Sequence, residues 1–151
     1  VQKARARGVL FEAADARAHF SFAVGEAAIK QGFYPDIIAT DLTKLSMHLR
    51  PTAFNLANQI GKYCFFGMPL ESVIACCTSV PAQQMGLDKT IGCLSVGADA
   101  DITIFRKSRE AVVFGDRIYS DPQCRLRQGE FLFRPMMTVK NGEMVYRDAS
   151  F

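Results

Sequence analysis

The stretch Tyr34–Thr43, YPDIIATDLT, decides the fold of this chain. Within it a short β-rich run, Ile37-Ile38-Ala39, stops at Thr40-Asp41, and a polar loop follows. Enzymes built as α/β barrels place catalytic side chains at the carboxyl end of a buried strand. Asp41 occupies that position, so it is the first candidate for a catalytic residue.

A strand and a helix are expected before this stretch. The apolar run after Gly8 predicts a buried strand over residues 8–13, and helical spacing of apolar residues predicts a helix from Phe20 to Gln31. Gly32 stands where a helix C-terminal stop belongs. With a strand over Asp36–Thr40, these segments have the length of a strand–helix–strand unit, which requires a parallel sheet covered by helices.

Helices are expected to dominate residues 1–86 and strands residues 87–151. The expected later helices are Ala53–Phe66 (with Thr52 as N-cap), Leu70–Cys77 and Pro81–Met85. The expected strands are Ile91–Val96, Ala100–Phe105, Ala111–Phe114, Phe131–Phe133, Met136–Val139 and Met144–Tyr146. Asn141-Gly142 is typical of the type I′ turn of a β-hairpin.

Composition excludes several classes of protein. The chain has 151 residues, 49% of them hydrophobic and 22% charged, which is typical of a globular protein. A net charge of +3 is too small to predict a nucleic-acid partner, and no stretch approaches the ~20 apolar residues of a membrane span. The five cysteines include no C-x-x-C pair, so we expect reduced thiols and a cytoplasmic protein.

The predicted parallel unit is incomplete by itself. Two parallel strands need cover on both faces and at both edges, and the second half offers antiparallel-looking strands instead. The chain also begins with Val1 and not with Met, so we expect its true start to lie upstream. The simplest interpretation is that residues 1–86 belong to a larger barrel.

Three motifs in order resemble the amidohydrolase superfamily. They are the strand Asp36–Asp41 followed by a helix, the run Ile91–Phe105 (IGCLSVGADADITIF), and the closing hairpin Thr138–Tyr146. Phe20-Ser21-Phe22 and the stretch Gln31–Asp36 make the chain most similar to the dihydroorotase-like amidohydrolase/deacetylase branch.

The resemblance implies an α/β fold. Residues 1–86 would be the last two strand–helix units of a (β/α)8 metal-dependent hydrolase barrel, and residues 87–151 most of a small β-sandwich domain. The chain would then be a C-terminal fragment whose partner is the missing N-terminal part of the same polypeptide, in a homo-oligomer.

The resemblance also implies the chemistry, which is zinc-dependent hydrolysis of the C–N bond of a small-molecule amide or cyclic amide. Asp41 would match the family's strand-eight aspartate, which contacts the metal and accepts a proton from the attacking water. The family's other ligands, a His-x-His pair, a carboxylated Lys or its equivalent and two further His, would lie upstream of Val1. We therefore expect the fragment to be inactive by itself and to bind zinc weakly.

Asp15, Arg17 and His19 are the candidates for substrate binding, because they lie in the loop after the first strand, on the same side as Asp41. Arg17 suits a substrate carboxylate, which a guanidinium grips with two hydrogen bonds. The alternative is that Asp15 and His19 only cap the loop and the helix start. Some relatives carry His-Gly where this chain has Asp15-Ala16, so the substrate chemistry departs from theirs.

Two other functions are compatible with the sequence. In the first, the chain is a non-catalytic assembly module with an amidohydrolase-like fold, in which Asp41 is structural. It would otherwise belong to an α/β barrel hydrolase that uses no metal.

Overall fold

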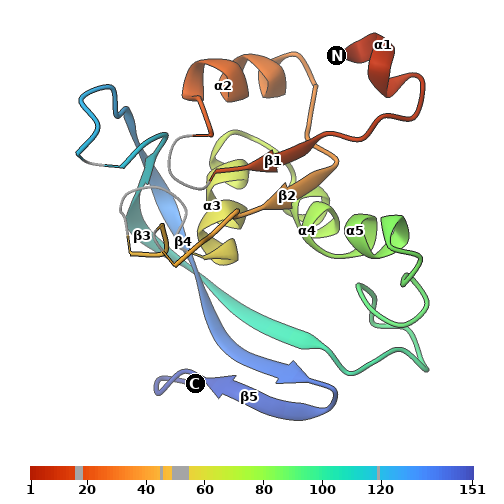
Figure 1. The fold of residues 1–151 in the computed structure, drawn as a ribbon. Coiled ribbons are helices and arrows are strands. Elements are labelled where there is room, and N and C mark those ends of the chain that lie inside the picture. The colour runs from red at the N-terminus through yellow and green to blue at the C-terminus, as the bar shows by residue number, and fades with distance from the viewer. Residues whose placement is uncertain (16–18, 45, 49–54, 119) are drawn as a thin grey trace.

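The computed structural model describes residues 1–15, 19–44, 46–48, 55–118 and 120–151 (Figure 1). Its elements are, in chain order, α1 Gln2–Arg5, β1 Glu12–Ala14, α2 Phe22–Lys30, β2 Ile37–Ala39, α3 Leu56–Phe65, α4 Leu70–Cys77, α5 Ser79–Gln84, β3 Ile102–Gly115, β4 Leu126–Lys140 and β5 Glu143–Arg147. They form a two-stranded sheet, β1-β2, and a three-stranded sheet, β3-β4-β5.

The predicted strand–helix–strand unit is confirmed. Strands β1 and β2 are parallel, with Ala13 opposite Ile38, and α2 connects them. Helix α2 ends where Gly32 adopts a φ of +71°, and the Phe33 N–H donates to the Ala28 carbonyl oxygen at 2.9 Å. A glycine in this conformation satisfies the last carbonyl groups of the helix, as the sequence predicts.

The first strand is shorter than expected, because residues 8–11 form no ladder with β2. Asp36 instead holds this segment, since its carboxylate accepts from the Phe11 N–H and from the Arg5 guanidinium, both at 2.8 Å. The Arg5 guanidinium also stacks on the Phe33 ring, 3.9 Å from its centroid. The short helix α1, which the sequence analysis did not predict, is thereby tied to the start of β2.

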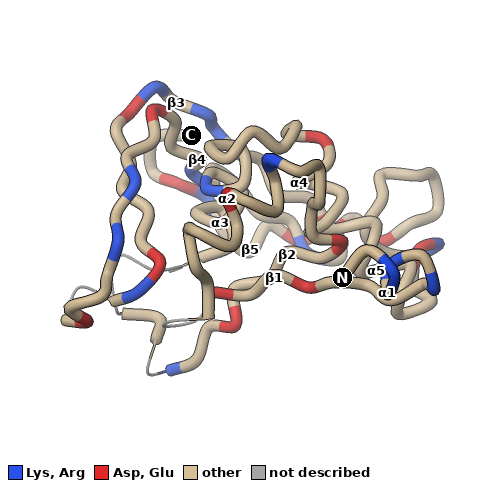
Figure 2. The backbone as a smooth tube through the Cα atoms, turned by 90° about the horizontal axis from the view of Figure 1, so that it is seen from above, with Lys and Arg blue, Asp and Glu red and all other residues tan. Residues whose placement is uncertain are grey.

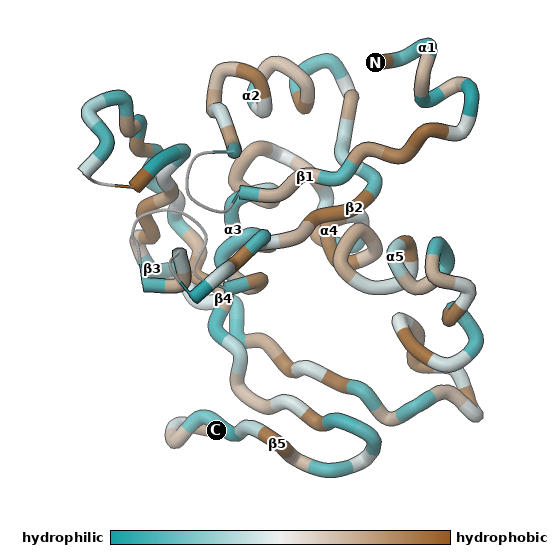
Figure 3. The backbone as a smooth tube through the Cα atoms, in the orientation of Figure 1, coloured by the Kyte–Doolittle hydropathy of each residue, from teal (hydrophilic) through white to brown (hydrophobic). Residues whose placement is uncertain are grey.

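Both halves of the chain share one hydrophobic core. It joins α2, β2, α3, α4 and β4 through Ile29, Ile38, Ala57, Ile60, Tyr63, Met68, Val73, Cys76 and Phe133. Helix α3 lies between the two-stranded sheet and the long β3–β4 hairpin (Figure 1). Hydrophobic residues are concentrated along the run into β1 and along β2 (Figure 3).

Helix α3 begins one turn later than a Thr52 cap would place it. Asn55 is the N-cap, and its side chain accepts from the Asn58 N–H at 2.7 Å, whereas Thr52 lies outside the described residues. Helix α5 begins at Ser79, two residues before the expected Pro81. The Thr78 hydroxyl donates to the Ile74 carbonyl oxygen at 2.7 Å, so it closes α4 and does not cap α5.

Four of the expected strands are in fact two long ones. Strand β3 contains both Ala100–Phe105 (from Ile102) and Ala111–Phe114, while β4 contains Phe131–Phe133 and Met136–Val139. The charged run 106–110 (RKSRE) was expected to separate two strands, but it lies on a hairpin that is exposed over much of its length. Charged side chains are compatible with such a strand because they point into solvent.

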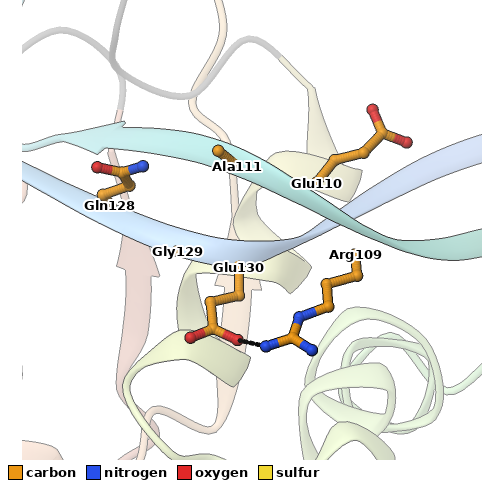
Figure 4. Close-up of a pocket in the computed structure, with 6 residues that line it drawn as sticks. All are labelled: Arg109, Glu110, Ala111, Gln128, Gly129 and Glu130. Atoms are coloured by element: carbon orange, nitrogen blue, oxygen red, sulfur yellow. Dashed lines mark hydrogen bonds and ion pairs between the residues drawn. The ribbon is translucent and has the colours of Figure 1, made fainter.

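The β3–β4 ladder contains a register shift between Arg109 and Val112. At this position the Arg109 guanidinium and the Glu130 carboxylate form an ion pair at 3.3 Å (Figure 4). Glu110 points away from this pair, to the other side of the hairpin (Figure 4). Both partners of the pair are mostly exposed, so its contribution to stability is small.

One expected strand is wrong and one expected turn is right. Residues 91–96 form bends and irregular backbone, in which Gly92 has a φ of +75° and lies so close to α5 that a Cβ there would approach Ala82 Cβ to 2.7 Å. Asn141 and Gly142 have φ values of 51° and 81°, which fits the predicted type I′ turn between β4 and β5.

Charged residues of both signs alternate along the chain (Figure 2). The five cysteine thiols are unpaired, as expected. Among the described residues, no helix has the length and apolar character that crossing a membrane requires.

Candidate active site

The carboxyl ends of β1 and β2 bring two of the predicted site residues into contact. His19 follows β1 and Asp41 follows β2, and Nδ1 of His19 lies 3.1 Å from Oδ2 of Asp41. The two side chains are 66% and 47% exposed, so both face open solvent at this end of the sheet. Parallel pairing explains the contact, because it places the ends of both strands at one edge.

The backbone at Asp41 is unusual. Its φ of 51° lies in the left-handed region, which non-glycine residues seldom occupy and which aspartate tolerates better than most. This conformation turns the chain sharply away from β2 directly after the strand. Strained residues of this kind cluster at functional sites, which agrees with the expected role of Asp41.

The side chain of Asp15 is buried and does not face solvent. Its carboxylate forms an ion pair with Nζ of Lys62 in α3, and both side chains are 1% exposed. Its backbone carbonyl oxygen accepts from the His19 N–H at 3.0 Å. The predicted contact between Asp15 and a substrate remains a prediction, and this geometry favours an indirect role through His19.

Lys62 is a site residue that the sequence analysis missed. Burial lowers its pKa to about 7, and the negative charge of Asp116 opposes this shift. The ammonium group also lies 4.0 Å from the centroid of the Phe20 ring. The sequence carries one signal for this residue, since Asn58, Gln59 and Lys62 recur at helical spacing and form a polar face of α3. The burial of all three is seen only in the structure.

The other candidates are placed as follows. Arg17 lies outside the described residues, so its role stays a prediction. His48 is exposed. Asp101 has a structural contact instead, because its carboxylate accepts from Lys140 Nζ and from the Asn141 N–H, and these bonds lower its pKa.

His19 and Asp41 have the ligand chemistry for part of a zinc site. Imidazole nitrogen and carboxylate oxygen are both zinc ligands, and His19 and Asp41 offer one of each at the same open edge. Among the described residues, no group of three or more His, Cys, Asp or Glu side chains lies close enough together to hold a metal ion. A catalytic zinc site uses about three protein ligands, so further ligands must come from elsewhere.

A parallel strand–helix–strand unit with an exposed carboxylate at its carboxyl edge is typical of α/β enzymes, which place catalytic side chains at the carboxyl ends of their strands. Comparison with known proteins makes this class specific. The family model described as "Amidohydrolase family" matches residues 17–145, so the chain belongs to the amidohydrolase family.

Two bacterial proteins named deacetylase are similar in sequence to this chain. This chain is 33% identical over 144 residues to a deacetylase of Brucella anthropi, and the alignment covers 95% of this chain and 34% of that protein. It is 31% identical to a deacetylase of Agrobacterium fabrum, over 95% of this chain and 33% of the relative.

Two solved structures are also similar. An adenine deaminase matches with a TM-score of 0.85 and 26% identity, over 97% of this chain and 38% of that one. A dihydroorotase matches with a TM-score of 0.80 and 30% identity, over 97% and 37%. The chain thus spans about a third of the length of the relatives that it matches.

Proposed function

We propose that this chain is the C-terminal part of a metal-dependent amidohydrolase that hydrolyses the C–N bond of an amide or cyclic amide. Residues 1–86 would supply the last two strand–helix units of its (β/α)8 barrel, and residues 87–151 most of its small β domain. The relatives named deacetylase and dihydroorotase support this reaction class. The contact between His19 and Asp41 at the carboxyl edge of the β1-β2 sheet is the observation that carries the proposal.

Asp41 has the central role in the proposed reaction. Asp41 is exposed at the carboxyl edge of the β1-β2 sheet, so it can take a proton from the attacking water at a carboxylate oxygen and deliver it to the leaving nitrogen. His19 holds Asp41 Oδ2 at hydrogen-bond distance and so fixes the direction of the carboxylate. A zinc ion held by Asp41 and by ligands from the rest of the protein would lower the pKa of water and polarise the carbonyl group.

Substrate contacts are proposed for the loop after β1. Arg17 would pair with a substrate carboxylate, and the exposed His19 would lie beside the scissile bond. We further propose that the 151-residue chain alone neither binds zinc tightly nor turns over substrate. The absence of a three-ligand cluster among the described residues supports this.

The test uses the full-length protein, with dihydroorotate and N-acetylglycine as probe substrates. We expect one or two zinc ions per chain in the wild type, and Asp41→Asn should lower kcat by at least about 100-fold, as expected for loss of a general base. The matched control is Asp88→Asn, an exposed aspartate far from β2 in the sequence, which should leave metal content and kcat unchanged.

Two outcomes would contradict the proposal. A protein that contains no metal and is unaffected by Asp41→Asn would support the non-catalytic assembly module. A metal-free protein that still hydrolyses an amide would support a barrel hydrolase of another kind.

A further inference from the structure

A continuous set of contacts leads from a buried cation to the proposed catalytic carboxylate. Lys62 binds the side chain of Asp15, the Asp15 carbonyl oxygen accepts from the His19 N–H at 3.0 Å, and His19 Nδ1 lies 3.1 Å from Asp41 Oδ2. The first pair is fully buried and the last is exposed.

Stability alone is a poor explanation for the buried pair. Taking two charges out of water costs free energy that their attraction seldom exceeds, and apolar residues of similar size often serve as well or better. An ion pair does provide a fixed geometry, because a buried carboxylate stays next to its cation once the cation is held in place. Lys62 is fixed by the Phe20 ring and by its place in the last turn of α3.

The β3–β4 hairpin places a second carboxylate near Lys62. Asp116 directly follows β3, is 8% exposed, and its negative charge acts on Lys62. Its carboxylate accepts from the Arg125 N–H at 2.7 Å, which closes the turn before β4. Lys62 is therefore faced by carboxylates from the loop after β1 and from the β3–β4 hairpin, while it belongs to α3.

We propose that Lys62 is a positioning residue, which fixes the turn after β1 through Asp15 so that His19 is presented to Asp41. This inference rests on the proposed function for its effect on catalysis, but not for its effect on His19. It assigns Lys62 no contact with substrate. The charged groups that face it are Asp15 and Asp116.

The principal variant is Asp15→Asn/Lys62→Met in the full-length protein, because it removes both charges of the pair together, while Asp116 keeps its hydrogen bond from the Arg125 N–H. The first measurement is the ¹³C NMR signal of the His19 imidazole at a fixed pH, labelled at Cε1 and assigned with His19→Gln. We expect this signal to move and to broaden, because the His19 ring is no longer held beside Asp41, while the thermal midpoint stays close to that of the wild type.

The second measurement separates kcat from KM, with dihydroorotate and N-acetylglycine as substrates. We expect kcat to fall by at least about 10-fold with KM changed by less than about twofold, since misplaced groups lower the rate more than binding. The control is Lys89→Met, which removes an exposed lysine and should alter neither readout.

The results separate the two proposals. A changed His19 signal in a protein without hydrolase activity would support the positioning role and contradict the proposed function. An unchanged His19 signal in the double variant would overturn the positioning role, whatever the activity. If the double variant does not fold, Asp15→Asn at about pH 8 replaces it, because a neutral amide then faces a largely neutral amine, and the same criteria apply.

Discussion

Gly129 tests the packing that attaches the β3–β4 hairpin to α3. It lies opposite Val112 in the ladder, and a Cβ at this position would approach Phe114 Cε2 to 2.8 Å and Val112 Cγ1 to 3.2 Å. The Phe114 ring has no room to retreat, since it is 1% exposed and packs against Gly61 and Phe65 on its other side. Overpacking of this kind costs about 1–3 kcal/mol, so Gly129→Ala should lower the free energy of unfolding by that amount.

The assay is urea unfolding at equilibrium, with a matched control on the other side of the same ring. In Gly61→Ala the new methyl group would lie 3.5 Å from Phe114 Cζ, an ordinary contact, and alanine is better than glycine in a helix by up to about 1 kcal/mol. Gly61→Ala should therefore be neutral or stabilising. Phe114→Leu should reduce the additional cost of Gly129→Ala, because it removes the atoms that clash.

Two results would refute this reasoning. One is a Gly129→Ala variant as stable as the wild type. The other is equal destabilisation by Gly129→Ala and Gly61→Ala, which would mean that neither contact is as the structure has it.

Three other predictions concern titration, capping and turn geometry. Between about pH 7 and about pH 8.5 the free energy of unfolding should rise by at most about 1.4 kcal/mol per pH unit, because folded Lys62, with its pKa lowered to about 7, has lost a proton that the unfolded chain keeps. Above that range the rise should stop, because burial raises the pKa of Cys77 to about 12, whereas the unfolded thiol ionises at about pH 8.5, and this contribution offsets that of Lys62. Urea unfolding at several pH values is the measurement, and a curve that is flat between about pH 7 and about pH 8.5 would contradict the prediction. Asn55→Ala should cost about 1 kcal/mol through loss of the α3 cap, whereas Asn55→Ser should cost much less, and equal urea midpoints for the two would contradict the cap. Gly142→Val places a β-branched residue at a φ of 81°, so hydrogen exchange of the β5 amides should accelerate while that of α3 does not change; Asn141→Gly, which suits the same turn, should have little effect.

Local sequence signals were sufficient wherever an element depends on its own residues. The helix stop at Gly32, the turn at Asn141-Gly142 and the β-rich run before Asp41 were all predicted, since each depends on the conformational preference of a few neighbouring residues. The same signals failed for β3 and β4. There the predicted strands leave out the charged run 106–110. Only the pairing of β3 with β4 shows that this run belongs to one long strand.

The sequence by itself determined the class of this protein, because the order of its motifs and the carboxylate after β2 suffice to indicate an amidohydrolase. It also predicted that Asp41 and His19 would share one edge of a parallel sheet. Only the tertiary structure decided which groups hold them there. Lys62 is an ordinary helical lysine in the sequence, and it becomes a buried partner of Asp15 because α3 places it next to the end of β1. Burial and charge proximity arise from segments far apart in the chain, so no local pattern can reveal them.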